Sequence, residues 1–187
     1  MLKNVEEFGK YIVIAGFKNG KIDSREALAS IGKEKQPQTE IQFFNAKLIA
    51  TWQHIYFGVL NALTAFRNGE NISESLAVET MLYVSAQRQI RKAVELIGVK
   101  PSALEVAVVV IGDKPEIVKS TLKVVAKRVD GQLDNSILEL SKEKRTSIQK
   151  VFEISDVELE TAKEKTDADK ALIDLVIERM ALLSTRR

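Results

Sequence analysis

An uncharged stretch from residue 48 to residue 66 dominates the hydrophobic pattern of the chain. Its length would suffice to cross a bilayer. Polar residues are scattered through it, however, among them Gln53, His54, Asn61 and Thr64. Each would need a hydrogen-bonding partner in lipid. The apolar residues recur at three- and four-residue intervals, which is typical of an amphipathic helix. The pattern therefore predicts a long buried helix near residues 45–67, with Asn45 as its N-cap and Asn68-Gly69 as its stop.

Three short runs rich in β-branched residues predict strands. They cover Tyr11–Phe17, Thr39–Phe44 and Glu105–Ile111. The third run is apolar almost throughout, which is typical of a central strand that is buried on both faces.

The remaining periodicity predicts further helices, most of them with a recognisable cap. They cover Ser24–Lys35, Leu76–Ala86, Gln87–Ile97 and Asp113–Val129, and two more begin near Ser155 and Thr166. We expect the capping groups to be Ser24, Asn71 with Glu74, Asp113, Ser155 with Glu158, and Thr166 with Asp169. Residues 131–150 show no clear pattern. The elements together predict an α/β fold in which a small central sheet of about three or four strands is covered by helices.

The length and composition limit the kinds of protein that this chain can be. With 187 residues, 45% of them hydrophobic, one sizeable core can form, so we expect a single domain over residues 1–187. Residues 130–187 would form a helical C-terminal extension of that domain. The absence of cysteine excludes disulfides and thiol nucleophiles. The first residues lack the organisation of a signal peptide, so we expect a cytoplasmic protein without a membrane segment.

Catalytic motifs are poorly represented. His54 is the only histidine, and a single histidine on an apolar helix is more often a hydrogen-bonded packing residue than a catalytic one. No Walker loop, HExxH motif or spaced Ser/His/Asp set is present. We therefore expect no cofactor, no metal ion and no enzymatic activity. One alternative remains open, in which His54 and Glu79 converge in a pocket.

A basic segment is the better candidate for function. Arg88, Arg91 and Lys92 are spaced so that they would share one face of a helix, with Gln89 beside them. Guanidinium groups bind phosphates or stack on bases, and an amide can read a base edge. A solvated helix face is the alternative interpretation. The net charge of +2 neither demands nor excludes nucleic acid.

Several short motifs, taken in order, resemble the TPRKB family, the small kinase-binding subunits of the KEOPS complex. They are Gln42–Ala46, His54, Glu79–Tyr83, Arg88–Ile90 and the closing Val176–Leu183. One departure is Ala86, where the family pattern leads us to expect glycine or another very small residue. The resemblance covers residues 40–112 best and residues 130–165 least.

The resemblance implies a binding role in the modification of tRNA. KEOPS places a threonylcarbamoyl group on the adenosine next to the anticodon, and this family docks on its kinase-like ATPase and grips the 3′ CCA end of tRNA. By that implication, the RNA-binding residues would be Lys47, His54, Arg88, Gln89, Arg91 and Lys92. The kinase-binding residues would be Leu172, Leu175, Met180 and Leu183. For His54 we favour a packing role over a place in the RNA-binding pocket, and packing remains the alternative role for the four apolar residues. A pure protein scaffold without RNA binding remains the alternative function.

Overall fold

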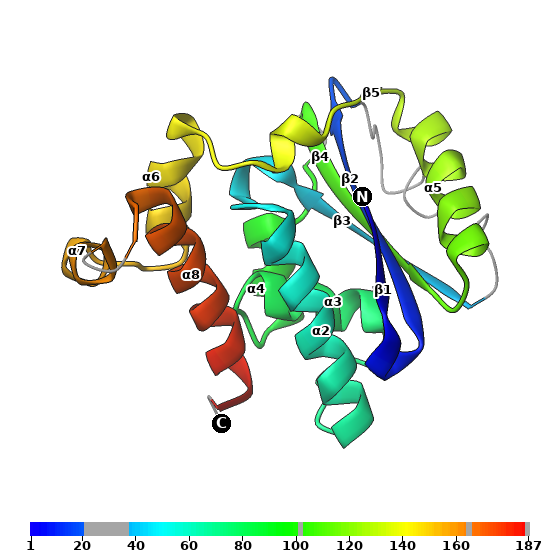
Figure 1. Cartoon of the computed structure of the whole chain (residues 1–187), viewed down its shortest axis with the longest axis horizontal. Coiled ribbons are helices and arrows are strands. Elements are labelled where there is room, and N and C mark those ends of the chain that lie inside the picture. The colour runs from blue at the N-terminus through cyan, green and yellow to red at the C-terminus, as the bar shows by residue number, and fades with distance from the viewer. Residues whose placement is uncertain (21–37, 101–102, 164–165, 186–187) are drawn as a thin grey trace. The chain divides into compact units, whose positions relative to one another are not determined.

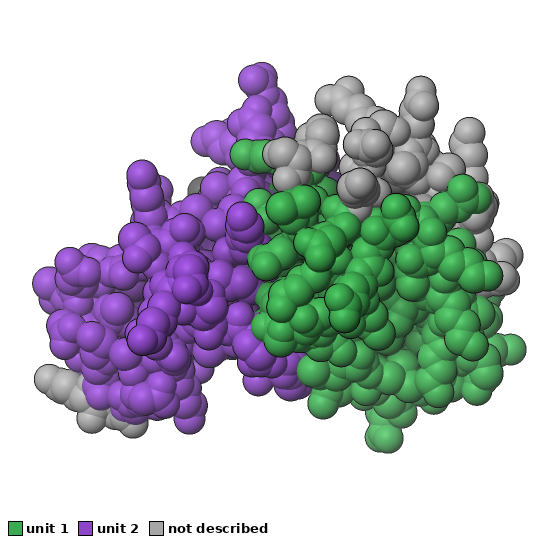
Figure 2. Space-filling view, turned by 90° about the horizontal axis from the view of Figure 1, so that it is seen from above, with its two compact units in different colours: residues 1–46, 98–138 green, residues 47–97, 139–187 purple. Residues whose placement is uncertain are grey.

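The computed structural model describes residues 1–20, 38–100, 103–163 and 166–185 (Figure 1). The chain divides into two compact units, which Figure 2 colours separately. The first comprises residues 1–46 and 98–138, and the second comprises residues 47–97 and 139–187. The helix predicted over Ser24–Lys35 lies outside the described residues. The prediction of a single domain stays a prediction.

The first unit contains an antiparallel sheet whose strands follow the order β1-β2-β4-β3, with β5 paired to β2. The strands are β1 (Leu2–Val5), β2 (Lys10–Lys18), β3 (Thr39–Asn45), β4 (Glu105–Gly112) and β5 (Gln132–Leu133). β4 is buried on both faces, as its composition predicted. The three predicted strands and the α/β class are confirmed. The two additional strands, β1 and β5, have no apolar run to reveal them.

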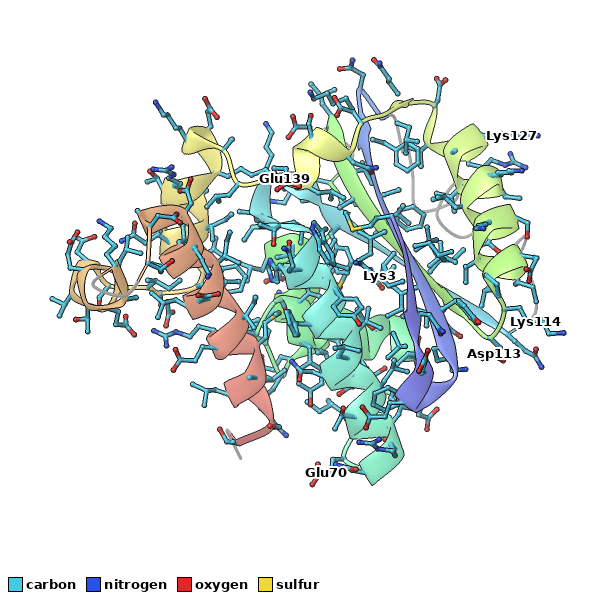
Figure 3. All side chains as sticks on the ribbon, viewed as in Figure 1. Lys3, Glu70, Asp113, Lys114, Lys127 and Glu139 are labelled. Carbon is cyan, nitrogen blue, oxygen red and sulfur yellow. The ribbon has the colours of Figure 1, made fainter. Side chains whose placement is uncertain are left out.

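Helix α5 (Pro115–Val129) follows β4 directly and has Pro115 in its first turn. Lys114 occupies the N-cap position without a side-chain cap bond, so the prediction that Asp113 caps this helix is wrong. The Asp113 carboxylate instead accepts a hydrogen bond from the Lys10 ammonium on β2. Figure 3 shows Asp113 and Lys114 at the junction between strand and helix.

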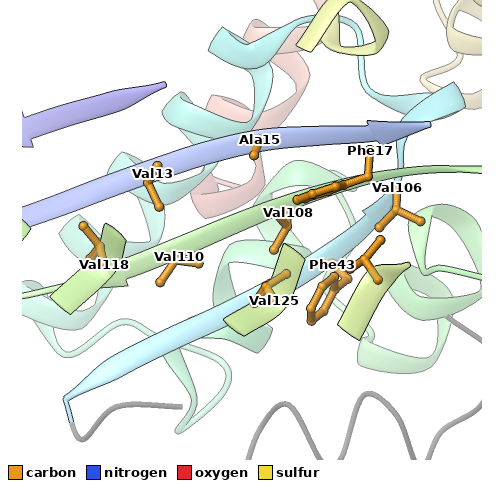
Figure 4. Packing of buried hydrophobic residues seen from close by; sticks show 10 residues of the cluster. Val13, Ala15, Phe17, Phe43, Val106, Val108, Val110, Val118 and Val125 are labelled. Atoms are coloured by element: carbon orange, nitrogen blue, oxygen red, sulfur yellow. The ribbon is translucent and has the colours of Figure 1, made fainter. Parts of the chain in front are cut away.

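Alternating residues of the sheet pack under α5 and form the core of the first unit (Figure 4). Val13, Ala15 and Phe17 point to one face of β2 because successive side chains of a strand alternate between faces. The other buried members of this cluster are Phe43, Val106, Val108, Val110, Val118, Val125 and Val129. The inner face of α5 is therefore committed to the sheet.

The second unit is helical. Its helices are α2 (Trp52–Asn68), α3 (Leu76–Val84), α4 (Ile90–Ile97), α6 (Lys142–Val151), α7 (Asp156–Lys163) and α8 (Ala168–Ala181). Short 3₁₀ helices are Glu6–Phe8 and Asn135–Leu138 in the first unit, Leu182–Thr185 in the second, and Ala46–Leu48 where the chain passes from the first to the second. Among the described residues no helix is both long enough and apolar enough to span a membrane.

Helix α2 begins later than the sequence predicts. Asn45 is the last residue of β3, where it pairs with Val106, so it is not an N-cap. A 3₁₀ turn follows, and Thr51 occupies the N-cap position of α2. The predicted stop is confirmed, since Gly69 adopts a left-handed conformation (φ 69°) that suits glycine.

Two other predicted caps and one predicted helix start also differ from the structure, although α3 begins at Leu76 as predicted. The cap of α3 is Ser75, whose hydroxyl accepts a hydrogen bond from the amide of Val78, rather than Asn71. The cap of α8 is Asp167 rather than Thr166. Helix α4 begins at Ile90 rather than at residue 87. The capping box of Ser155 with Glu158 is confirmed by reciprocal hydrogen bonds.

Candidate nucleic-acid interface

The basic segment begins at a tight turn that ends α3. The amide of Ala86 donates to the Tyr83 carbonyl at 2.8 Å, and the amide of Gln87 donates to the Leu82 carbonyl at 3.0 Å. This pair of bonds is a Schellman motif, which places Ala86 in the left-handed region (φ 51°). Glycine is at ease in that conformation and alanine is not, which explains in physical terms why glycine is expected at Ala86. The turn keeps the Schellman geometry with alanine in place.

His54 contacts the backbone at the start of this turn. Its Nδ1 accepts a hydrogen bond from the amide of Ala50 at 3.2 Å, so Nε2 carries the proton and donates to the Val84 carbonyl at 2.8 Å. Val84 is the last residue of α3, where carbonyls lack partners within the helix. The ring of Phe152 packs edge-on at 5.3 Å between ring centroids. His54 therefore joins the segment before α2 to the end of α3.

Burial also sets the charge of His54. The side chain is completely buried, and burial, together with the nearby Lys144 ammonium, lowers its pKa from 6.5 to about 4 against the opposing effect of the Val84 bond. The ring is therefore neutral at pH 7. A neutral histidine with both nitrogens bonded and no exposed surface cannot contact RNA in this structure. The packing role that the sequence favoured for His54 is the one that the structure shows.

Glu79 of α3 is a second buried polar residue of this unit. Its Oε2 accepts hydrogen bonds from the amides of Ile72 and Ser73 at 3.0 and 2.8 Å, which pins the connection between α2 and α3. Burial raises the pKa of Glu79, while the two amides and Arg88 oppose that effect. His54 and Glu79 thus each bind backbone groups rather than one another. Among the described residues no cluster of three or more His, Asp or Glu side chains is placed to hold a metal ion.

The predicted shared helix face is wrong for Arg88, because Arg88 precedes α4. Its Nη1 donates to the Leu183 carbonyl at 3.3 Å, beyond the end of α8. Gln89 is exposed and its carbonyl accepts from the amide of Ala93, so its backbone begins α4. Arg88 and Gln89 therefore lie on the turn, whereas Arg91 and Lys92 lie on the helix.

The cations of α4 are presented to solvent. The Arg91 side chain is 90% exposed, and its Nε donates to Glu95 Oε1 at 2.9 Å on the same helix. Lys92 is exposed and lines a cleft of about 300 Å³ with Gln87 and Glu153. Lys47 is also exposed, on the 3₁₀ helix that precedes α2. The structure brings Arg88, Gln89, Arg91 and Lys92 into one exposed segment, and Lys47 is not part of it.

A second, smaller cleft of about 50 Å³ lies against the same turn and is lined by Ser85, Ala86 and Gln87 on one side. The C-terminal end of α6 lines the other side, and it repeats the Schellman geometry with Glu153 in the left-handed region (φ 52°). Arg179 of α8 also lines this cleft, and its Nε donates to the Phe152 carbonyl at 3.4 Å. Two helix C-termini therefore meet around one guanidinium, which complements their negative dipole ends.

The predicted kinase-binding residues of α8 divide into two groups. Leu172, Met180 and Leu183 are buried, whereas Leu175 is half-buried. Leu175 lines a groove of about 590 Å³ between α7 and α8, together with Val157, whose side chain is among the most exposed large apolar ones at 77%. Of the four residues, Leu175 alone is open to a partner in this structure.

Comparison with known families matches residues 17–184 to a family described as "Kinase binding protein CGI-121". The chain belongs to the CGI-121 family. A relative from Methanocaldococcus jannaschii, "Regulatory protein Cgi121", is 30% identical over 115 residues, which are 62% of this chain and 71% of the relative. The resemblance to the TPRKB family is thereby confirmed. The family is named for kinase binding and the relative for regulation, and neither name describes a reaction.

The CGI-121 match includes both the Arg88–Lys92 segment and helix α8. Two residues that support these regions were missed by the sequence analysis. Lys144 is buried, and its Nζ donates to the Ile49 carbonyl at 3.1 Å. Arg179, in the last turn of α8, binds Glu158 in the first turn of α7. Lys144 stood inside a charged run and Arg179 near a helix end, so neither carried a signal that would separate it from solvated neighbours.

Proposed function

We propose that this chain is a non-catalytic subunit of the KEOPS complex that binds the kinase-like ATPase subunit and the 3′ CCA end of tRNA. In this role it supports formation of threonylcarbamoyladenosine next to the anticodon by holding the substrate at its opposite end. The observation that carries the proposal is the exposed segment Arg88–Lys92, which follows a turn fixed by hydrogen bonds on a chain of the CGI-121 family.

The geometry of the segment suits an unpaired RNA end. Single-stranded ends are bound through splayed bases and a few phosphate contacts, so a small surface suffices. Arg91 reaches into solvent with its guanidinium held only by Glu95 of the same helix, and an exposed ion pair of this kind is weak. A phosphate can therefore take the place of Glu95. Lys92 would add a second cation beside a cleft.

The turn itself is held rigidly enough to present these groups. His54 fixes the Val84 carbonyl just before the turn, and Arg88 bonds to the Leu183 carbonyl just after it. Binding groups that are already positioned lose less conformational entropy when a ligand arrives. In this proposal Arg88, Gln89, Arg91 and Lys92 contact RNA, Lys47 adds a phosphate contact, and His54 positions the turn.

For the kinase we propose the groove between α7 and α8. It offers the apolar side chains of Val157 and Leu175 beside the acidic residues Asp174 and Glu178. Interfaces combine an apolar centre with a polar rim, and this groove has both. The buried residues Leu172, Met180 and Leu183 support it from beneath.

The test is a gel-shift experiment with intact tRNA and with the same tRNA trimmed of its terminal CCA. The wild-type chain should shift the intact tRNA and fail to shift the trimmed one. The double substitution Arg88→Glu and Arg91→Glu should abolish the shift without unfolding, since exposed charges contribute little to stability. A matched control, Lys150→Glu with Lys170→Glu, changes two exposed cations of the same unit and should bind normally. Equal shifts of both tRNAs would remove the proposed grip on the tail.

A pure scaffold is the second candidate, and one observation favours it. Arg88 and Arg91 already have partners within the chain, at Leu183 and Glu95, as residues of a solvated face often do. A scaffold would co-elute with the KEOPS kinase subunit from a sizing column and would shift neither tRNA. Under that outcome, Leu175→Ser would weaken co-elution while Arg88→Glu would leave it unchanged.

A further inference from the structure

The outward face of α5 carries a row of three lysines that the proposed function does not use. Lys119, Lys123 and Lys127 are all exposed and succeed one another at intervals of four residues. Four residues of helix rise by about 6 Å, so the three side chains form a stripe about 12 Å long. In Figure 3 the side chain of Lys127 extends away from the sheet that α5 covers.

Helix α5 is strongly basic. Within residues 115–129, four cations stand against the single carboxylate of Glu116, which makes a net charge of +3. Helix α6 has the same net charge, but there Lys144 is buried and Arg145 pairs with Asp169. The whole chain has a net charge of +2, so the remainder is slightly acidic. The small net charge of the whole chain therefore does not reveal that the exposed face of α5 is strongly basic.

These lysines also lack the counter-charge that some other helical cations have. Arg91 pairs with Glu95 in α4, and Lys163 pairs with Glu160 in α7. Within the part of the chain that the structure describes, Lys119, Lys123 and Lys127 have no ion-pair partner. Like charges four residues apart on a helix repel one another. A stripe of this kind opposes the stability of its own helix and suits an external polyanion.

The chemistry of the face favours a nucleic-acid backbone over a protein. Protein interfaces are built around apolar or aromatic groups at their centre. No exposed large apolar side chain belongs to α5 among the described residues, because its apolar face packs on the sheet. The same commitment leaves no apolar face that could enter a lipid surface. Evenly spaced cations without apolar neighbours match the requirements of phosphate contacts.

We propose that Lys119, Lys123 and Lys127 form a second RNA-binding surface, which contacts the phosphate backbone of tRNA without reading its sequence or its 3′ end. The inference rests on the proposed function in that tRNA is the RNA concerned. The stripe belongs to the first unit of the chain and the Arg88–Lys92 segment to the second, so each can be altered separately. Contact through the stripe adds affinity that depends on salt, and the tail-binding segment adds the preference for CCA.

The experiment measures the affinity of the full chain for intact and for trimmed tRNA over a series of KCl concentrations. The variant is the triple Lys119→Gln, Lys123→Gln and Lys127→Gln. Each phosphate contact contributes roughly 0.7–0.9 to the slope of log affinity against log salt, so the slope should become shallower by about 2 with either tRNA. The ratio of the affinities for intact and trimmed tRNA should not change.

The matched control removes the same charge elsewhere, with Lys142→Gln, Lys150→Gln and Lys170→Gln, which are exposed lysines of the second unit. It should keep the wild-type slope. An unchanged slope in the α5 variant, or an equal change in both variants, would overturn the proposal. So would loss of binding to phosphatidylserine vesicles with no change for tRNA. A different result would separate the two proposals. If wild type binds intact and trimmed tRNA equally while the α5 variant has a shallower slope of log affinity against log salt, the tail-binding function is wrong and the proposed lysine surface is supported.

Discussion

The burial of His54 makes the stability of the fold depend on pH in a defined window. The pKa of His54 is about 4 in the folded state, against 6.5 for an exposed histidine. Because the folded pKa is depressed, the unfolded chain binds the proton more readily. The stabilising contribution is therefore complete above pH 6.5 and is lost as the pH falls from 6.5 toward 4.

The size of this effect follows from the two pKa values. One pKa unit corresponds to about 1.4 kcal/mol, so the full difference amounts to about 3 kcal/mol below pH 4. At pH 5 the unfolded chain is almost fully protonated at His54 while the folded chain is not, and about 2 kcal/mol should already be lost. That is a large share of the net stability of a typical domain.

The assay compares wild type with His54→Gln by urea unfolding at pH 7.5 and pH 5. The glutamine side chain does not titrate, and other ionisable groups cancel in the comparison. We expect the difference in unfolding free energy between the two proteins to shrink by about 2 kcal/mol at the lower pH. Because His54 is the only histidine, its NMR titration also gives a single signal, with an expected midpoint near 4. A midpoint near 6.5, or a difference that does not depend on pH, would refute the burial argument.

Three further predictions concern the packing of the second unit. A Cβ added at Gly58 would lie 2.3 Å from Val84 Cγ2, so Gly58→Ala should lower the free energy of unfolding by about 1–2 kcal/mol in a urea titration. Adding Val84→Ala to the same chain should relieve most of the destabilisation caused by Gly58→Ala. Met180→Ala should lower the free energy of unfolding by about 2–5 kcal/mol because Met180 is fully buried. Leu175→Ser should lower it by about 1 kcal/mol or less and should weaken kinase binding in a pull-down. Equal losses of stability in the two variants would contradict the division of these residues into buried and open. Burial raises the pKa of Glu79, so its negative charge opposes folding as the pH rises above 4.5. Glu79→Gln should therefore make the thermal unfolding temperature less sensitive to pH between 4.5 and 7. The same dependence on pH in wild type and variant would contradict this.

The sequence predicted the elements better than their ends. The uncharged stretch showed α2 because a buried helix repeats its apolar residues at a fixed interval. Its start was misplaced because Asn45, a good cap by residue type, is held in β3 by pairing with Val106, a residue far away in the chain. Long-range pairing of this kind leaves no local pattern.

The candidate site could be only partly predicted from the sequence, because its geometry also depends on features that leave no local pattern. The positive charges of Arg88, Arg91 and Lys92 are visible in the sequence, but their common helix face is not what the structure shows. The left-handed conformation of Ala86 ends α3 and delays α4, and alanine carries no sign that it will adopt this conformation. The carbonyl partner of His54 lies 30 residues away, which explains why the sequence could name the residue but not its contact.

The apolar stripe of α8 illustrates a further limit. Leu172, Val176 and Met180 follow one ridge of α8 and are buried, as is Leu183 in the 3₁₀ helix that follows. Leu175 lies beside that ridge and is half-buried. Periodicity identifies an apolar stripe about two side chains wide, but only the packed neighbours decide which of its members remains open to a partner.

The central claim is that the Arg88–Lys92 surface holds an unpaired RNA end. Competition with short single-stranded RNAs tests it most directly, because such RNAs lack the rest of the tRNA. An oligonucleotide that ends in CCA should displace labelled tRNA from the wild-type chain, and one of equal length that ends in GGU should not. Equal displacement by the two, or displacement by neither, would contradict the account.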